Sequence, residues 1–119
     1  MMRKNINGQI GEEFTVKYLK KKGYKILETN FHSRFGEIDI IARKNKYIAF
    51  VEVKTRDEKY IVHPLEAVTK SKQNKIILTA QYYLLQLKDN LQPRFDVASI
   101  ICSNQKPVSI EYIENAFTL

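Results

Sequence analysis

The sequence predicts an α/β domain with the element order α-β-β-β-α-β-β. Two segments repeat apolar residues at helical spacing, and five runs are rich in β-branched and aromatic residues. The chain has 119 residues, 44% of them hydrophobic and 28% charged, which is ordinary for a globular protein with one core. We therefore expect a single domain over residues 1–119, built as a mixed central sheet flanked by helices.

Two helices are expected on the basis of apolar spacing. Residues 7–22 carry Ile10, Phe14 and Tyr18 at positions i, i+4 and i+8. A second pattern runs from about residue 70 to 88 and consists of Ile76, Ile77, Ala80, Tyr83, Leu84 and Leu87. Each of the two patterns predicts an amphipathic helix that packs its apolar face on the sheet.

Two runs near the middle of the chain are expected to form the centre of the sheet. They are Ile38–Ala42 and Tyr47–Lys54, and the polar segment between them, Arg43–Lys46, has hairpin length. Both runs are almost continuously apolar, which is typical of strands covered on both faces. The two strands should therefore pair as antiparallel neighbours.

Three further strands complete the predicted sheet. Tyr24–Thr29 mixes β-forming residues with charges and suits a partly exposed strand, after which residues 30–36 have the composition of a turn. Arg94–Cys102 and Val108–Tyr112 predict the last two strands. Thr55–His63 is polar and is expected to be an exposed loop.

The charge of the chain favours a polyanionic partner. Twenty Lys and Arg residues against thirteen Asp and Glu give a net charge of +7. Residues 1–60 hold 14 of the basic and 8 of the acidic side chains, so the excess lies in the first half. Basic proteins bind nucleic acids through counterion release and electrostatic steering. Nucleic acid is therefore the expected partner.

The cysteine and histidine content and the distribution of apolar residues exclude several classes of protein. Cys102 is the only cysteine, which excludes an intramolecular disulfide and a cysteine zinc cluster. His32 and His63 are too few and too far apart to suggest a histidine metal site. The N-terminus has no apolar signal-peptide core, and no run reaches the ~18 apolar residues of a membrane span. A cytoplasmic location with no membrane partner is expected.

Ionisable residues interrupt the two central strands. An unpaired charge in such a strand costs about several kcal/mol or shifts its pKa until the group is neutral. Because side chains alternate with a period of two, Glu37 and Asp39 share one face of the first strand. Glu52 and Lys54 likewise share a face of the second. If the hairpin register brings these faces together, Asp39, Glu52 and Lys54 lie within a few ångströms of one another.

Two carboxylates beside an ammonium suit hydrolysis of a phosphodiester with Mg²⁺ or Mn²⁺. Hard oxygen ligands hold Mg²⁺ without removing all its waters, and the metal activates a bound water and neutralises transition-state charge. Lys54 would orient or deprotonate the attacking water, or stabilise developing negative charge. A structural reading stays open, in which Glu52 and Lys54 form a buried ion pair and Asp39 accepts a backbone hydrogen bond.

Several sequence blocks occur in order along nearly the whole chain: Gly11-Glu12, Asn30, Gly36-Glu37-Ile38-Asp39, Phe50-Val51-Glu52-Val53-Lys54-Thr55-Arg56, Lys72-Gln73, Arg94-Phe95-Asp96-Val97 and Asn115-Ala116-Phe117. Together these blocks resemble the YraN-like family of uncharacterised bacterial proteins. That family is similar to the PD-(D/E)xK nuclease superfamily and, within it, to archaeal Holliday-junction resolvases. The resemblance implies a restriction endonuclease-like three-layer fold. One departure is Ile38, which stands where the superfamily's name has a proline that many members lack.

The resemblance also implies roles for individual residues. Asp39, Glu52 and Lys54 would form the metal and catalytic centre. Glu12 looks like the extra acidic residue that resolvases bring to the metal from the first helix. Glu13 is a rival for that role, and either carboxylate also suits the N-terminal part of a helix. Because resolvases cut two strands symmetrically, the resemblance further suggests a homodimer.

Several polar residues are candidates for contact with nucleic acid. Lys72 and Gln73 resemble a polar pair that opens the later helix facing the site, and the alternative is that they are surface residues of its first turn. Arg34, Arg43 and Arg56 are expected beside the site, where arginine suits bidentate contacts with phosphate.

The predicted function is hydrolysis of phosphodiester bonds in DNA, in preference to RNA, with branched or damaged DNA as candidate substrates. The alternative is a non-catalytic nucleic-acid-binding module on the same fold, in which the acidic cluster is a relic or holds a structural ion.

Overall fold

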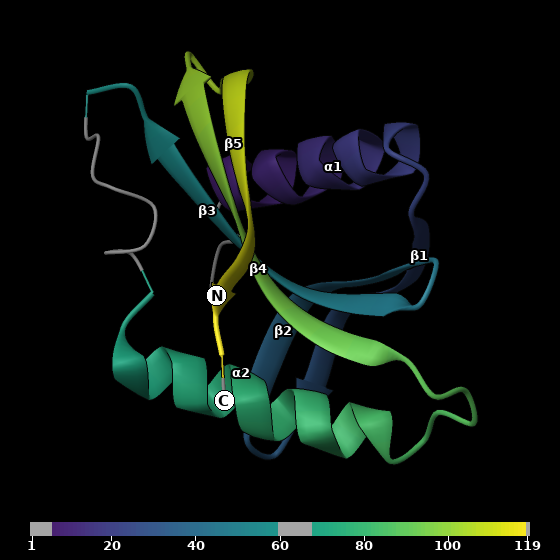
Figure 1. The fold of residues 1–119 in the computed structure, drawn as a ribbon. Coiled ribbons are helices and arrows are strands. Elements are labelled where there is room, and N and C mark those ends of the chain that lie inside the picture. The colour runs from purple at the N-terminus through teal and green to yellow at the C-terminus, as the bar shows by residue number, and fades with distance from the viewer. Residues whose placement is uncertain (1–5, 60–67, 119) are drawn as a thin grey trace.

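A computed structural model describes residues 6–59 and 68–118 of the chain (Figure 1). The order of its elements is the predicted α-β-β-β-α-β-β. Within these ranges, no helix is both long and apolar enough to span a bilayer. The elements are α1 (Ile6–Lys21), β1 (Lys25–Ser33), β2 (Gly36–Lys44), β3 (Tyr47–Asp57), α2 (Lys70–Leu84), β4 (Gln92–Ser103) and β5 (Lys106–Phe117).

The five strands form one mixed sheet in the order β1-β2-β3-β4-β5. Three antiparallel pairs, β1–β2, β2–β3 and β4–β5, join strands that follow each other in sequence. β3 and β4 pair in parallel, and α2 belongs to the crossover between them. The antiparallel pairing predicted for the two central strands is confirmed, with Lys44 opposite Tyr47 and Ile40 opposite Val51.

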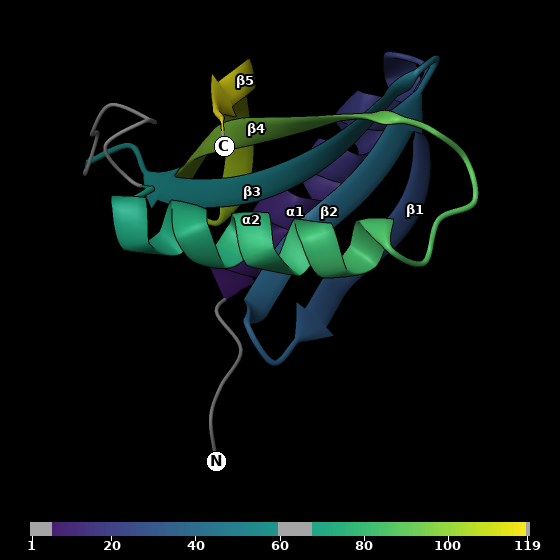
Figure 2. The ribbon, with the colours of Figure 1, turned by 60° about the horizontal axis from the view of Figure 1, so that its bottom comes forward.

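Helices α1 and α2 cover opposite faces of the sheet (Figures 1 and 2). Under α2, Ile41 and Phe50 join a core cluster that includes Ile76 of the helix itself. Under α1, Ile40 and Val51 join a second cluster. The apolar residues of β2 and β3 thus contribute to both layers, which explains why their sequences are almost continuously apolar.

The first strand extends beyond its predicted end. β1 continues through residues that were expected to form a turn and ends at Ser33. Phe31 explains the extension, because its ring packs edge-on against Tyr83 of α2 with centroids 5.0 Å apart. Asn30 stays within the strand by adopting a positive φ of 53°, a conformation that asparagine tolerates better than most residues.

The third strand is also longer than predicted. β3 continues past Lys54 to Asp57, so the start of the expected loop is strand. Parallel pairing with β4 as far as Cys102 supplies the backbone partners for this extension. Residues 60–63 of the predicted loop lie outside the described residues. The extension matters because it fixes Lys54 and Thr55 on a rigid element.

The second helix begins where predicted and ends earlier. Thr69 caps its N-terminus, with Oγ1 accepting a hydrogen bond from the N–H of Lys72 at 3.2 Å. The helix stops at Leu84, although the apolar pattern continues to residue 87. Leu87 still packs against the core under α2. The apolar pattern therefore predicted the packing of Leu87 correctly, but the predicted end of the helix was wrong.

Candidate active site

Strands β2 and β3 separate at Asp39, and the candidate site lies in this split. Their pairing ends at Ile40 and Val51, whereas β3 stays paired with β4 as far as Asp57. Beyond the last pair, Asp39 Oδ2 accepts a hydrogen bond from the backbone N–H of Val53 at 2.8 Å. The carboxylate therefore satisfies a β3 donor that would otherwise face a β2 carbonyl.

Glu52 lies in β3 beside this split and is almost fully buried, with its side chain 4% exposed. Two ammonium groups contact its Oε2 atom, Lys72 Nζ at 2.7 Å and Lys54 Nζ at 3.4 Å. Lys54 comes from β3 itself and Lys72 from the first turn of α2. Oppositely charged partners of this kind offset the cost of burying a carboxylate so deeply. The site thus contains a second lysine at the carboxylate, beside the expected one.

Burial raises the pKa of Asp39 to about 7. The negative charges of Glu52 and Glu12 add to the rise, and the hydrogen bond from Val53 opposes it. The charge of Lys72 acts in the same direction as this hydrogen bond. Asp39 is consequently a carboxyl group that exchanges its proton near neutral pH, as residues in active sites often do.

The two lysines differ in how firmly they hold their protons. Burial lowers the pKa of Lys54, and the neighbouring charge of Lys72 adds to the decrease although Glu52 opposes it. Burial also acts to lower the pKa of Lys72, but its hydrogen bond to Glu52 and the charge of that carboxylate outweigh burial and raise it. Lys72 is therefore the more permanent positive charge, and Lys54 the more easily deprotonated amine.

Helix α1 approaches β3 very closely at Gly11. A Cβ atom at this position would lie 2.0 Å from Thr55 Oγ1, so glycine is required for the contact. Thr15 Oγ1 donates to the carbonyl of Gly11 at 2.7 Å, whereas Thr55 Oγ1 is buried without a hydrogen-bond partner in the described part of the chain. The close approach brings Glu12, the next residue of α1, near enough to act electrostatically on Asp39.

The donors present fit a Mg²⁺ ion in their chemistry. Asp39 and Glu52 present carboxylate oxygens, the ligands that Mg²⁺ prefers. A cation would also relieve the repulsion from Glu52 that, after burial, raises the pKa of Asp39. Within residues 6–59 and 68–118, no three His, Cys, Asp or Glu side chains form a group that could hold a metal. The predicted third ligand, Glu12, is therefore not assembled with the other two, and a Mg²⁺ ion would keep several waters.

Arg43 and Gln73, two of the predicted nucleic-acid contacts, have other roles. Arg43 lies towards the opposite end of β2 from Asp39 and pairs with Asp89 at 2.6 Å, so its predicted place beside the site is wrong. Gln73 Nε2 donates to the carbonyl of Val68 at 3.1 Å. Its side chain thus contacts the segment before α2.

Arg34, Arg56 and Glu37 lie on the periphery. Arg34 is exposed in the turn between β1 and β2, with its guanidinium 4.9 Å from the centroid of the Phe35 ring. Arg56 is half-buried on β3, beyond Thr55. Glu37 pairs with His32 at 3.2 Å, and both side chains are mostly exposed. Glu37 is therefore a surface residue, although it shares a strand with Asp39.

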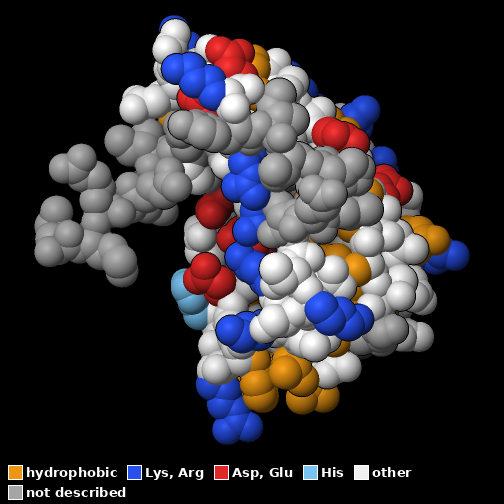
Figure 3. Space-filling view, turned by 90° about the vertical axis from the view of Figure 1, so that its left-hand side faces the viewer, with side chains coloured by type: hydrophobic (Ala, Val, Ile, Leu, Met, Phe, Trp, Pro, Cys, Tyr) orange, Lys and Arg blue, Asp and Glu red, His pale blue; other side chains and the backbone are white. Residues whose placement is uncertain are grey.

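Two grooves border the site. Figure 3 views the molecule from the end where β3 finishes and α2 begins, and shows Lys and Arg side chains in a line with acidic side chains beside them. A groove of about 350 Å³ between the start of β2 and the first turns of α2 is lined by Gly36, Glu37, Thr69, Ser71, Lys72, Lys75 and Ile76. A second groove of about 410 Å³ between α1 and β1 is lined by Gln9, Glu12, Glu13, Val16, Lys17, Lys20, Thr29 and Asn30.

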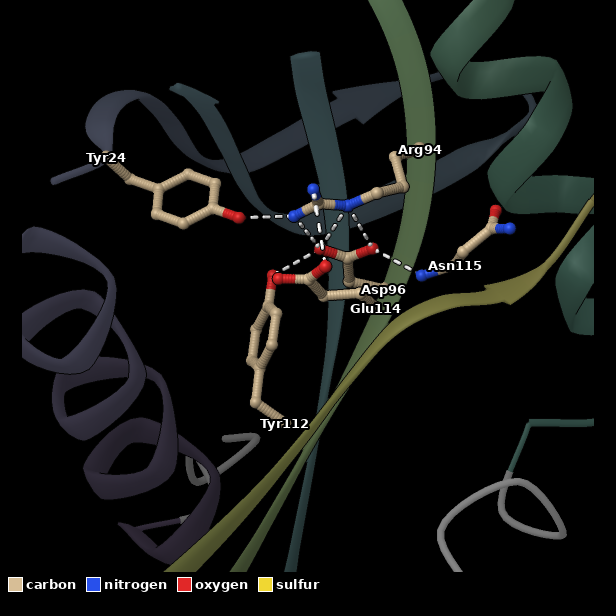
Figure 4. Close-up of polar contacts among 6 residues, drawn as sticks. All are labelled: Tyr24, Arg94, Asp96, Tyr112, Glu114 and Asn115. Carbon is tan, nitrogen blue, oxygen red and sulfur yellow. Dashed lines mark hydrogen bonds and ion pairs between the residues drawn. The ribbon is translucent and has the colours of Figure 1, made fainter. Parts of the chain in front are cut away.

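A second buried carboxylate centre lies in β4, on Asp96 (Figure 4). Asp96 is fully buried and accepts hydrogen bonds from Arg94 Nη2 at 2.8 Å, Tyr112 Oη at 2.6 Å and the Asn115 N–H at 2.9 Å. Arg94 also donates to the hydroxyl of Tyr24. Burial, followed by the charge and hydrogen bond of Asp96, raises the pKa of Tyr112 well above its usual value. The centre connects β4 and β5 to Tyr24, in the segment between α1 and β1.

The role of Asp96 was not predicted, although its sequence block was noticed. The signal was present, because Asp96 interrupts an apolar strand just as Asp39 and Glu52 do. The partners could not be read from the sequence, since Tyr24 lies 70 residues from Arg94. Lys72 was expected on a helix facing the site, but its ion pair with Glu52 could not be read from the sequence for the same reason.

The family model and the similar proteins all identify the same family. The model of a family described as "Uncharacterised protein family UPF0102" matches residues 11–100. A UPF0102 protein of Persephonella marina is 47% identical over 96% of this chain and 95% of its own length. Relatives from Alkaliphilus metalliredigens, 46% identical over 92% and 96%, and from Caldanaerobacter subterraneus, 43% identical over 98% of each chain, carry the same family name. The YraN-like resemblance is thereby confirmed, and the chain belongs to the UPF0102 family.

Proposed function

We propose that this protein is a metal-dependent endonuclease of the PD-(D/E)xK type on a restriction endonuclease-like fold. The observation that carries the proposal is the split between β2 and β3. There burial, followed by the charge of Glu52, raises the pKa of Asp39 to about 7. Glu52 itself is almost fully buried, and its Oε2 atom lies 2.7 Å from Lys72 Nζ and 3.4 Å from Lys54 Nζ. Two carboxylates and an amine on adjacent rigid strands are suited to phosphodiester hydrolysis.

Each residue has a chemical task in this proposal. Asp39 and Glu52 would hold Mg²⁺, which supplies an activated water and neutralises charge on the phosphate. Lys54, an ammonium group 3.4 Å from Glu52, would orient the attacking water and stabilise the negative charge that develops as the water oxygen bonds to phosphorus, while the proton of that water passes to solvent. The bond from phosphorus to the leaving oxygen breaks, and that oxygen gains a proton from solvent. Lys72 keeps its charge and stabilises the negative phosphate.

The proposed substrate is DNA, with branched or damaged DNA first, and the proposed assembly is a homodimer. The net charge of +7 supports a nucleic acid. The similarity to resolvases supports DNA over RNA and a symmetric pair of sites. We extend the proposal to a cytoplasmic location, where such a substrate would be met.

The test is cleavage of structured DNA by the purified chain. Four-way junctions, nicked duplexes and intact duplexes should be compared in Mg²⁺, in Mn²⁺ and in chelator, with cleavage expected only with metal. Asp39→Asn combined with Glu52→Gln should abolish it, by about 10²-fold or more. Glu37→Gln is the matched control, because it neutralises an exposed carboxylate of the same strand. Cleavage that survives in the double variant would point to a contaminating nuclease and reject the proposal.

A non-catalytic nucleic-acid-binding module is the second candidate. It is favoured by the contacts already made within the site, since Glu52 has two ammonium partners and Asp39 a backbone donor. This function predicts salt-dependent DNA or RNA binding without cleavage. Removing the carboxylates should then leave affinity unchanged or raise it, because negative charge near phosphate is lost.

A further inference from the structure

Two ammonium groups lie beside one carboxylate oxygen of Glu52, although a single positive charge would balance the charge of this residue. Lys72 Nζ and Lys54 Nζ contact the same atom, Oε2, at 2.7 and 3.4 Å. The two ammonium groups repel each other across this short distance. A divalent cation bound to the same carboxylate would add a third positive group within a few ångströms. At least one lysine must then move away from Glu52.

Lys72 is the lysine that can move. Its side chain is 42% exposed, against 20% for Lys54. Lys54 is anchored in β3, which pairs with β4 on both sides of this residue. Lys72 lies on α2 and lines the groove of about 350 Å³ that also borders Ser71 and Lys75. Its long flexible stem allows the ammonium to swing from Glu52 into this groove without moving the helix.

The groove offers a binding place for a phosphate once Lys72 enters it. Lys75 and Ser71 line it, so a phosphate there would meet two ammonium groups and a hydroxyl. Among the described residues that line the groove, Glu37 is the only acidic one, and it lies 3.2 Å from His32. A nucleic acid strand lying across the groove would therefore attract the ammonium that a metal ion displaces.

We propose that Lys72 is a displaceable counter-ion of Glu52, which leaves the carboxylate when a divalent cation binds and then holds a phosphate of the substrate in the α2 groove. The inference rests on the proposed metal site and adds a coupling to it. Metal binding releases the lysine that phosphate binding needs, and phosphate binding removes the charge that opposes the metal. Each ligand must then strengthen the other by the same factor.

The test measures Mn²⁺ binding directly, by calorimetry and by electron paramagnetic resonance, in wild type and in Lys72→Met. Without nucleic acid, Lys72→Met should bind Mn²⁺ more tightly by about fivefold or more, the lower range of ordinary coupling between sites. Lys70→Met is the matched control and should leave Mn²⁺ affinity unchanged, because Lys70 is an exposed lysine of the same helix that neither lines the groove nor pairs with Glu52 among the described residues. Lys72→Arg, which retains the charge, should behave like wild type.

The coupling is tested with a duplex DNA carrying phosphorothioate linkages, which resist cleavage. This probe should tighten Mn²⁺ binding to wild type and tighten it much less in Lys72→Met. Equal or weaker Mn²⁺ binding by Lys72→Met, or no Mn²⁺ binding by either protein, would overturn the inference. Tight Mn²⁺ binding with the expected coupling but no DNA cleavage would instead support Lys72 and reject the nuclease function. Thermal unfolding of each variant, with a midpoint near that of wild type, establishes that binding is measured on folded protein.

Discussion

Two carboxylates of the central strands, Asp96 and Asp39, differ in their burial and in the partners that surround them. Asp96 in β4 is fully buried, and a guanidinium, a phenol and a backbone N–H surround it. In the described part of the chain, Asp39 in β2 accepts one hydrogen bond, from Val53, and burial followed by the charge of Glu52 raises its pKa to about 7. Donors that match a charge complete a structural network. A carboxylate with fewer donors than it can accept, such as Asp39, remains available to bind a ligand or exchange a proton, which is typical of functional sites.

The largest effect is expected from breaking the complete network. Asp96→Asn keeps the shape of the side chain but leaves the Arg94 guanidinium, 13% exposed, without its buried counter-ion. Removing one partner of a buried ion pair costs about 3–5 kcal/mol of the free energy of unfolding. Urea denaturation at neutral pH, with the slope compared between proteins, measures the loss.

The control for this network is its outer carboxylate. Glu114 lies 3.7 Å from Arg94 but is 63% exposed. Glu114→Gln should change the free energy of unfolding by less than about 0.5 kcal/mol, because solvent screens such a pair. If Asp96→Asn proved as mild as Glu114→Gln, Asp96 would not be the structural counterpart of Asp39.

A smaller effect is expected at Asp39, and it depends on pH. The pKa rises from 3.8 to about 7 in the folded protein, chiefly through burial and then through Glu52. Between these values the folded state binds more protons than the unfolded state, so stability falls as pH rises from about 4 to about 7. The loss is complete above pH 7 and is on the order of 2 kcal/mol after allowance for coupling to Glu52.

Asp39→Asn removes the titrating group and should flatten this part of the stability curve. Relative to wild type, the variant should be more stable at pH 8 than at pH 4, as followed by chemical denaturation across this range. Glu37→Gln changes an exposed carboxylate of the same strand and should leave the pH dependence as in wild type. A parallel pair of curves for Asp39→Asn and wild type would show that Asp39 titrates normally and would contradict the predicted difference between Asp39 and Asp96.

The sequence was sufficient for the features that depend on local pattern. Almost continuously apolar runs rich in β-forming residues predicted β2 and β3, and their short polar connection predicted the hairpin. Charged residues within these apolar runs indicated Asp39 and Glu52. These inferences work because alternation and burial act over a few residues. The lengths of β1 and β3 were underestimated, because pairing with neighbouring strands and the packing of Phe31 on Tyr83 outweigh local composition.

The features that the sequence could not supply depend on contacts between distant segments. Lys72 reaches Glu52 only because α2 crosses the sheet at that level. Glycine is needed at position 11 only because α1 packs directly against Thr55 of β3. Neither helix position follows from amphipathic spacing, which tells which face is buried but not how far along the sheet the helix lies. The catalytic reading and the ion-pair reading of Glu52 therefore looked equal from the sequence, and the structure adds the second lysine to both.

The smallest effect is expected at Thr55, whose hydroxyl is buried beside Gly11 without a hydrogen-bond partner in the described part of the chain. Thr55→Val keeps the shape and removes this hydroxyl, so it should stabilise the protein by up to about 1 kcal/mol. Thr15→Val is the matched control, because Thr15 donates to Gly11 at 2.7 Å, and its loss should destabilise by about 1 kcal/mol. Thermal unfolding of both variants distinguishes the two threonines. If Thr55→Val destabilised as Thr15→Val does, the hydroxyl would have a partner in the folded protein. If Thr55→Val also weakened Mn²⁺ binding, that partner would belong to the site, and Thr55 would join Asp39 among the incompletely matched groups.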